Sequence, residues 1–247
     1  MALQPWRKGV VIRIEQLADG TRSFFIRIPD VEIFDFKPGQ FVTLDLPVHE
    51  KLNKRLRSYS IASWPDETNV IELCIVLMGG GLGTTYLFNE VTVGSELTFR
   101  GPVGVFTLPD PIDKDIFLIC TGTGIAPFRS MLNHISIHNI SHKDIYLIFG
   151  TRRKDNLLYY DELIELTKDI SGLHYIPTLS REVWEGKTGY VHQIYEDLIN
   201  KKKAVENDGI YPASFYLCGW KDMIDEAKKR IIELGFERKC IHQELYG

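Results

Sequence analysis

The sequence contains little cysteine, and its few cysteines are widely spaced. Cys74, Cys120, Cys218 and Cys240 form no CxxC pair and no zinc-ligand spacing. A disulfide framework would be unusual for a chain of 247 residues. Because the sequence has no four-cysteine iron–sulfur run, any one-electron iron centre that works with this chain must belong to another protein.

Membrane and secretory signals are equally scarce. No apolar stretch approaches the roughly 20 residues that a transmembrane helix needs. The opening MALQPWRKG lacks the apolar region of a signal peptide. We therefore expect a cytoplasmic protein with no membrane partner.

Positive charge is not in excess. Lys and Arg total 29 and Asp and Glu total 33, so the net charge is −4 and no basic surplus is available to neutralise nucleic acid. With 25% charged and 44% hydrophobic residues, the composition is that of a globular protein and excludes disorder, collagen and coiled coil. The length allows one large domain or two of ordinary size.

The first part of the chain, residues 1–109, has a strand-like pattern. Short runs rich in β-branched and aromatic residues are separated by turn signals such as Asp19-Gly20 and Pro38-Gly39. Six such runs predict a closed antiparallel six-stranded β-barrel, interrupted by one helix at 84–91. The runs are 10–14, 23–28, 40–46, 56–61, 70–76 and 96–100.

The second part, residues 110–247, alternates apolar strands with amphipathic helices. This alternation is typical of βαβ units and predicts an α/β domain with a parallel sheet and helices on both faces. The prolines around Asp110 mark a short domain boundary. The expected strands are 116–120, 145–149, 174–177 and 214–218, and the expected helices are 126–137, 159–169, 191–199 and 223–234.

Two motifs of the first part suit a flat, phosphorylated ligand. In Arg57-Ser58-Tyr59-Ser60, an arginine fork suits a pyrophosphate, a tyrosine ring suits an aromatic ligand and a serine hydroxyl can reach a ring nitrogen. The run Gly79-Gly80-Gly81 lies just before the expected helix, whose N-terminal amides attract phosphate. Taken singly, the motifs also fit a polar strand end and a flexible hairpin loop.

Three motifs of the second part suit a dinucleotide. The run 120–127, Cys-Thr-Gly-Thr-Gly-Ile-Ala-Pro, joins a strand to a helix where a pyrophosphate docks, although Pro127 replaces the third glycine of GxGxxG. Ser180-Arg181, with Lys187 and Tyr190 nearby, suits a 2′-phosphate, where NAD sites usually place an acid. Tyr-Leu-Cys-Gly at 216–219 ends a strand at the same sheet edge.

Two further patterns are interpreted as background. His134, His138 and His142 are spaced four residues apart, but Asn139 and Ser141 indicate that the helix has ended, and no carboxylate accompanies them. We therefore expect no metal site. The lysines 201–203 are interpreted as a solvated helix end.

Taken in order, the motifs resemble those of the ferredoxin–NADP reductase family over nearly the whole chain. The order is Arg-x-Tyr-Ser, Gly-Gly-x-x-Thr, Gly-Pro-Val-Gly-x-Phe at 101–106, Thr-Gly-Thr-Gly-Ile-Ala-Pro, Ser-Arg, Tyr-x-Cys-Gly and a terminal Glu-x-Tyr. The resemblance implies two cofactors, FAD and NADP(H).

The resemblance also implies roles for the residues of the FAD site. Arg57 would hold the pyrophosphate, Tyr59 would stack on one face of the isoalloxazine and Ser60 would hydrogen-bond flavin N5. The backbone of Cys74, Ile75 and Val76 would line the ribityl chain and the ring. The pyrophosphate cradle would comprise Gly81, Leu82, Gly83 and Thr84.

On the NADP side, the resemblance implies that Thr123 and Gly124 meet the nicotinamide nucleotide. The 2′-phosphate and adenine would contact Ser180, Arg181, Lys187 and Tyr190. Cys218 and Gly219 would lie beside the nicotinamide, Glu244 would relay charge or protons and Tyr246 would cover the other flavin face. The expected catalytic residues are therefore Ser60, Cys218, Glu244 and Tyr246.

The implied activity is hydride transfer between NADP(H) and flavin N5, followed by single-electron steps to ferredoxin or flavodoxin. These carriers are usually acidic, and Lys51, Lys54 and Arg55 would offer them local positive charge. The alternatives are the reductase component of an oxygenase chain, an NAD(P)H:flavin reductase and a non-catalytic electron-transfer subunit. The oligomeric state stays open, and a monomer is compatible with the sequence.

Overall fold

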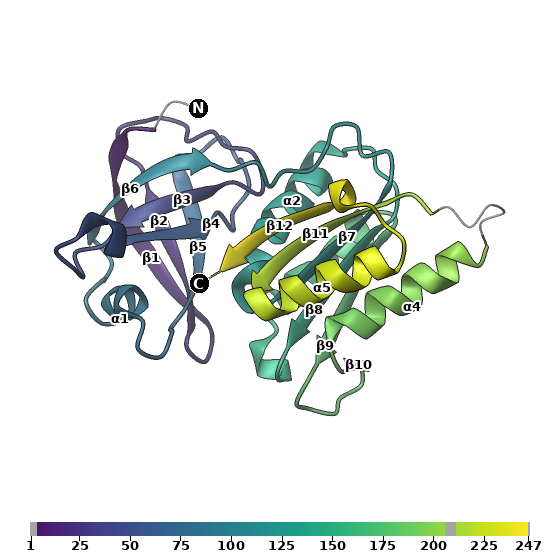
Figure 1. Ribbon diagram of the computed structural model, residues 1–247. Coiled ribbons are helices and arrows are strands. Elements are labelled where there is room, and N and C mark those ends of the chain that lie inside the picture. The colour runs from purple at the N-terminus through teal and green to yellow at the C-terminus, as the bar shows by residue number, and fades with distance from the viewer. Residues whose placement is uncertain (1–3, 206–210, 247) are drawn as a thin grey trace. The chain divides into compact units, whose positions relative to one another are not determined.

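The computed structural model describes residues 4–205 and 211–246, which form two six-stranded sheets (Figure 1). Its contacts divide the chain into two compact units. The first, which we name the barrel unit, comprises Met1–Thr107 and Ala126–His134. The second, the α/β unit, comprises Leu108–Ile125 and Ile135–Gly247.

The barrel unit contains six antiparallel strands in the order β4-β3-β6-β1-β2-β5. The edge strands β4 and β5 meet at a bridge between Ile61 and Leu73 and through the Ala62 amide, which donates to the Glu72 carbonyl at 2.8 Å. The predicted closed barrel is therefore confirmed. Its elements are β1 (Trp6–Ala18), β2 (Thr21–Arg27), β3 (Phe41–Asp45), η1 (Leu52–Lys54), β4 (Leu56–Ser60), β5 (Val70–Val76), α1 (Leu82–Asn89) and β6 (Glu96–Val103).

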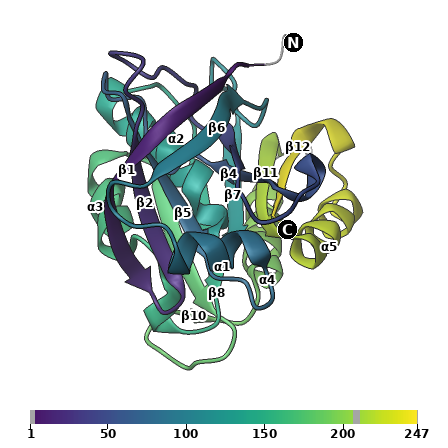
Figure 2. The ribbon, with the colours of Figure 1, turned by 90° about the vertical axis from the view of Figure 1, so that its left-hand side faces the viewer.

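The barrel interior is filled by alternate residues of its strands. Phe24 of β2, Leu73 of β5 and Phe99 of β6 are fully buried in one core cluster. On β2 and β5, the outward-facing Ser23 and Glu72 are buried as well. Residues 126–134 belong to this unit and contact the outer face of β5. Two views show α1 at one end of the barrel strands (Figures 1 and 2).

The α/β unit contains a parallel sheet in the order β10-β9-β8-β7-β11-β12. Its strands are β7 (Asp115–Thr121), β8 (Ile145–Thr151), β9 (Leu173–Leu179), β10 (Lys187–Thr188), β11 (Ala213–Trp220) and β12 (Ile241–Tyr246). The α-helices of this unit are α2 (Ile125–His138), α3 (Tyr160–Asp169), α4 (Val191–Lys203) and α5 (Lys221–Glu233). Its short 3-10 helices, labelled η as in the barrel unit, are η2 (Gly122–Gly124), η3 (Lys154–Asn156) and η4 (Arg238–Cys240).

Helices cover both faces of this sheet, as predicted. On one face, the rings of Tyr146, Phe117 and Phe215 stack across neighbouring strands at 4.8 and 5.2 Å between centroids. The buried residues of α4 and α5 join these rings in one core cluster, and Figure 1 shows both helices on this face. On the other face, α3 packs Tyr160 against Tyr175 of β9 at 6.0 Å.

The elements differ from the sequence pattern mainly at the C-terminus. Strand β12 is not predicted, because His242, Gln243 and Glu244 have little β propensity. Pairing with β11 in parallel register forms the strand instead. The end of α2 is as expected, since Asn139 adopts a left-handed conformation directly after His138. Among the described residues, no helix is long and apolar enough to cross a membrane.

Candidate active site

Arg57 lies against the N-terminus of α1. A Cβ at Gly83 would lie 3.1 Å from Arg57 Cγ and 3.2 Å from its Nε, so a side chain at this position would push the arginine away. Nη1 of Arg57 donates to the carbonyls of Lys54 at 3.1 Å and Leu56 at 2.7 Å. The first-turn amides of a helix have no acceptor within it. A guanidinium beside such amides forms an anion site that fits the pyrophosphate of FAD.

The hydroxyl of Thr84 forms two hydrogen bonds with the loop before α1, residues 78–81. It accepts from the Met78 amide at 3.0 Å and donates to the Gly81 carbonyl at 3.1 Å. Between these residues, Gly80 has a φ of +74°, which favours glycine. Because its hydroxyl is engaged within the loop, Thr84 can contribute only its backbone amide to the predicted pyrophosphate site.

The other expected flavin residues lie side by side at the closure of the barrel. Continuing the register of the Ile61–Leu73 bridge places Ser60 opposite Cys74 and Tyr59 opposite Ile75. Burial, opposed by the charge of Arg57, raises the pKa of Tyr59 to about 12, so its ring stays neutral at physiological pH. The Tyr59 side chain packs against the core cluster of the barrel, and its stacking on a flavin stays a prediction.

Two expected residues of this region have more limited roles. The hydroxyl of Ser58 lies 3.0 Å from that of Thr43 on β3, so it forms part of the sheet surface. Arg55 binds both carboxylate oxygens of Asp45, at 2.6 and 2.9 Å, so its charge is already paired. Of the three basic residues expected to attract a carrier, Lys51 and Lys54 are exposed.

In the α/β unit, the order of strands reverses between β7 and β11. Strands β8 and β9 follow on one side of β7, and β11 lies on the other. Open α/β sheets bind ligands at the carboxyl ends of the strands at such a switch point. The predicted nucleotide loop, with Thr123 in η2, follows β7, and Cys218 and Gly219 lie near the end of β11.

The two backbones meet closely at this switch point. A Cβ at Gly124 would overlap the Cys218 carbonyl oxygen and lie 2.7 Å from its carbon. A Cβ at Gly219 would overlap the Thr121 hydroxyl. Thr121 Oγ1 is buried and has no hydrogen-bond partner in the described part of the chain. Bare backbone and an unpaired hydroxyl fit a nucleotide that docks against this loop.

The predicted catalytic residues Cys218 and Glu244 are neighbours. They pair in register on β11 and β12, and Cys218 also pairs with Cys120 on β7, so all three lie on one face of the sheet. Burial, with the adjacent Cys218, raises the pKa of the Cys120 thiol. Cys218 is fully buried, whereas Glu244 is partly exposed. The backbone of Tyr246 pairs with Trp220, but its side chain lies outside the described residues, so its stacking on the flavin stays a prediction.

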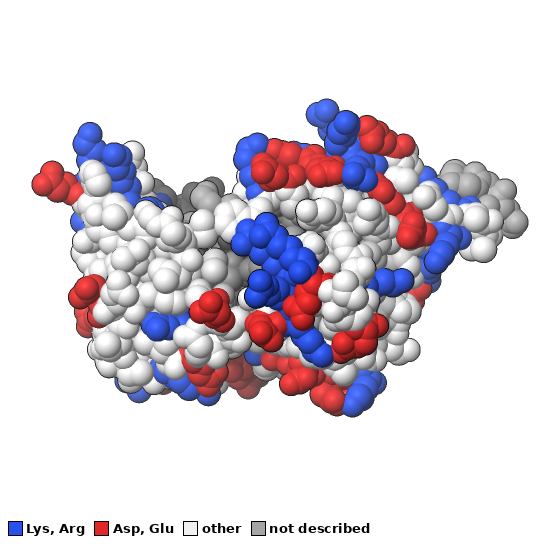
Figure 3. Space-filling view, turned by 90° about the horizontal axis from the view of Figure 1, so that it is seen from below, with Lys and Arg blue, Asp and Glu red and all other residues white. Residues whose placement is uncertain are grey.

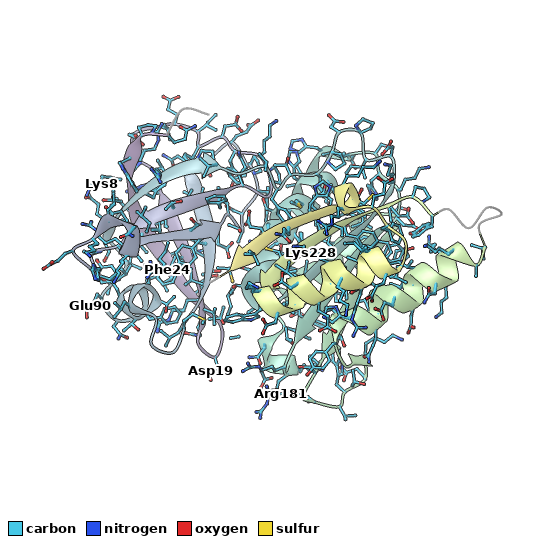
Figure 4. All side chains as sticks on the ribbon, viewed as in Figure 1. Lys8, Asp19, Phe24, Glu90, Arg181 and Lys228 are labelled. Carbon is cyan, nitrogen blue, oxygen red and sulfur yellow. The ribbon has the colours of Figure 1, made fainter. Side chains whose placement is uncertain are left out.

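The loop after β9 holds the expected 2′-phosphate residues. The amide and the hydroxyl of Ser180 both donate to the Thr151 carbonyl, at 2.9 and 3.2 Å. Arg181 is exposed at this sheet edge (Figure 4), and its amide donates to the Arg152 carbonyl at 3.0 Å. Lys187 of β10 pairs with Thr178 of β9.

Sequence reasoning missed two arginines at this edge. Arg152 and Arg153 directly follow β8, and both are exposed. Lys and Arg side chains gather on this side of the α/β unit (Figure 3). The available signal was an Arg-Arg pair immediately after an apolar strand. Tyr190, expected to contact the adenine, is the exposed N-cap residue of α4.

Comparisons with known proteins identify both parts of the chain. Residues 8–108 match the oxidoreductase FAD-binding domain, and residues 118–229 match the oxidoreductase NAD-binding domain. Ferredoxin–NADP reductase B of Sorangium cellulosum is 32% identical over 240 residues, which cover 96% of both chains. The phenol hydroxylase P5 protein of Acinetobacter pittii is 30% identical over 97% of this chain but only 65% of its own length. Among solved structures, an Amycolatopsis cytochrome P450 reductase has a TM-score of 0.84 and 25% identity, over 99% of this chain and 71% of its own.

Proposed function

The chain belongs to the ferredoxin–NADP reductase family, and we propose that it passes electrons between NADP(H) and ferredoxin or flavodoxin. FAD, when bound, supplies hydride transfer and single-electron chemistry. The observation that carries the proposal is the meeting of Gly124 with the Cys218 backbone at the switch point, beside Glu244. The match to ferredoxin–NADP reductase B over nearly the whole of both chains supports this choice of reaction.

Each unit contributes a defined set of groups. In the barrel unit, Arg57 and the N-terminus of α1 would hold the FAD pyrophosphate, and Ser60 would hydrogen-bond the flavin ring. In the α/β unit, Thr121 and the Gly122–Gly124 turn bind the nicotinamide nucleotide. Glu244 holds a negative charge or a proton beside Cys218, where the nicotinamide would lie.

The preference for NADP(H) over NAD(H) rests on the arginines after β8 and β9. Arg181 and Arg152 are exposed cations joined through the backbone, and a 2′-phosphate would bind both. Replacing Arg181 by Ala should raise the KM for NADPH about ten- to a hundredfold and leave that for NADH nearly unchanged. Lys168→Ala, which removes an exposed cation of α3 paired with Glu165, is the matched control. Equal losses for both nucleotides would contradict the assignment.

The reaction itself is tested by adding carriers to the purified protein. We expect a yellow protein with bound FAD that reduces ferredoxin or flavodoxin with NADPH. Reduction of free flavin alone, with no bound FAD, would instead identify an NAD(P)H:flavin reductase. An inability to oxidise NADPH outside a larger complex would identify a non-catalytic subunit.

The second candidate is the reductase component of an oxygenase. The similarity to the phenol hydroxylase P5 protein over 97% of this chain favours it. The chain spans less than two-thirds of that relative, so the remaining part of the relative has no counterpart in the given sequence. Faster electron transfer to an oxygenase than to ferredoxin and flavodoxin would decide for this candidate.

A further inference from the structure

A buried ion pair lies on the outer face of the barrel. Nη1 of Arg129 is 2.6 Å from Oε2 of Glu72, and the two side chains are 9% and 4% exposed. The same nitrogen donates to the Ala62 carbonyl at 3.0 Å. The guanidinium also lies 5.2 Å from the ring centre of Trp64. Arg129 thus joins α2, β5 and the segment after β4 within one unit.

Glu72 is fixed by further contacts. The Ser23 hydroxyl of β2 hydrogen-bonds its carboxylate, and its backbone amide donates to Ser63 Oγ at 3.0 Å. Burying two charges costs solvation, and apolar residues of similar volume often give equal or greater stability. Stability alone therefore gives little reason for an ion pair at this position, and its location points to another role.

The ion pair lies next to the residues expected at the reacting edge of the flavin. Ala62 is hydrogen-bonded to Glu72, and the same register places Ser60 opposite Cys74. Residues two apart on a strand face the same side and are about 7 Å apart. The ion pair is thus one row of side chains from Ser60 and Cys74, on the same face.

We propose that Arg129 and Glu72 are positioning residues for the flavin, an inference that rests on the proposed function. Arg129 holds the carbonyl of Ala62 and thereby fixes the strand end that carries Ser60. Glu72 balances the guanidinium charge, so the ring edge beside Ser60 experiences no net charge from this network. The pair therefore sets both the position and the reduction potential of the flavin.

Glu72→Gln tests the charge. Gln keeps the shape, and its carbonyl oxygen can accept from Arg129 while its NH2 group donates to the Ser23 hydroxyl oxygen, but it leaves the guanidinium charge unbalanced. The unbalanced guanidinium would lie one row of side chains from the predicted flavin edge, where its positive charge favours the reduced flavin. We expect the affinity for reduced FAD relative to oxidised FAD to rise about tenfold, which would be measured as a more positive midpoint potential. Arg129→Lys keeps the charges balanced, so its potential should stay near the wild-type value.

A double variant, Glu72→Met with Arg129→Met, tests the geometry. It should unfold at or above the wild-type temperature, because apolar side chains can replace a buried ion pair. It should nevertheless bind FAD several-fold more weakly and change the visible circular dichroism of the flavin. A purely structural pair would leave the flavin spectrum and potential unchanged in every variant that folds.

The matched control is Glu96→Gln, which removes one charge of the exposed Lys8–Glu96 pair in the same unit. It should leave affinity, spectrum and potential unchanged. Wild-type potential and spectrum in both Glu72→Gln and the double variant would overturn the inference. A wild-type protein that binds no FAD would instead overturn the proposed function, so the two failures are distinguishable.

Discussion

The two units are expected to bind dinucleotide phosphates by opposite means. In the barrel unit, the Arg57 side chain lies beside the first turn of α1, so the site depends on a charge that a mutation can remove. In the α/β unit, Gly124 touches the Cys218 backbone, so the site depends on the absence of a side chain. The FAD site should therefore lose affinity when the Arg57 side chain is removed. The nucleotide site should lose affinity when a side chain is added at Gly124.

The largest effect should come from Gly124→Ala. The φ of Gly124 is −61°, which alanine adopts easily, but the added Cβ would collide with the Cys218 carbonyl. Overpacking of this kind costs about 1–3 kcal/mol or more. We expect a lower unfolding temperature and at least about a hundredfold lower kcat/KM for NADPH, with FAD retained. Ser171→Ala, at an exposed residue after α3 in the same unit, is the control and should behave as wild type.

In the barrel unit, Arg57→Ala should leave the fold intact and weaken FAD binding. Loss of a charge-assisted contact costs about 1.5–3 kcal/mol, or roughly ten- to a hundredfold in affinity. The ratio of flavin to protein absorbance after purification measures the loss. Arg55→Ala removes a neighbouring arginine that is paired with Asp45 and should keep its FAD. Full flavin occupancy in Arg57→Ala would remove Arg57 from the site.

The regular elements could be predicted because their patterns are local. The apolar run at 70–76 coincides with β5, and the predicted turn at Asp19-Gly20 lies between β1 and β2. Strand β12 could not be predicted, since it forms only by pairing with β11. Arg129 was missed for a similar reason, because its sequence context shows an amphipathic helix and its partner Glu72 is 57 residues away.

The roles of the site residues stay predictions, and the contacts that join these residues had no signal in the sequence. Motif order placed Cys218 and Glu244 in one site, and their pairing on β11 and β12 follows only from the sheet topology. The engagement of the Thr84 hydroxyl within its own loop has no sequence signal. The domain boundary at residue 109 stays a prediction, although the contacts assign residues 126–134 to the barrel unit.

A smaller effect is expected from Glu244→Gln, which tests whether the α/β unit also contributes a charge. Glutamine keeps the shape and removes a titratable carboxylate beside Cys218. We expect normal folding and FAD content, a several-fold lower kcat and a changed pH–rate profile. Glu237→Gln, which affects the exposed pair with Lys239, is the control. A wild-type rate and profile would assign Glu244 to structure alone.

The smallest expected effect is a loss of folding stability of the α/β unit at low pH. Burial lowers the pKa of His192 on α4, opposed by Glu226 and reinforced by Arg230. His192 Nδ1 lies 3.0 Å from the Tyr195 hydroxyl, and Nε2 lies 3.6 Å from Glu226. The folded state therefore keeps the imidazole neutral at a pH where the unfolded chain, with an ordinary pKa of about 6.5, already binds a proton.

The stability from His192 is thus complete above about pH 6.5 and falls as the pH drops from there toward the folded-state pKa. The slope from one such group is at most about 1.4 kcal/mol per pH unit. Urea unfolding at pH 7.5 and 5.5 should show a smaller loss in His192→Asn than in wild type. Asn200→Ala, at an exposed residue of the same helix that does not titrate, should keep the wild-type loss. An unchanged loss in His192→Asn would place the acid sensitivity elsewhere. The next residue to replace would be the partly buried His242 of β12, because burial also lowers its pKa.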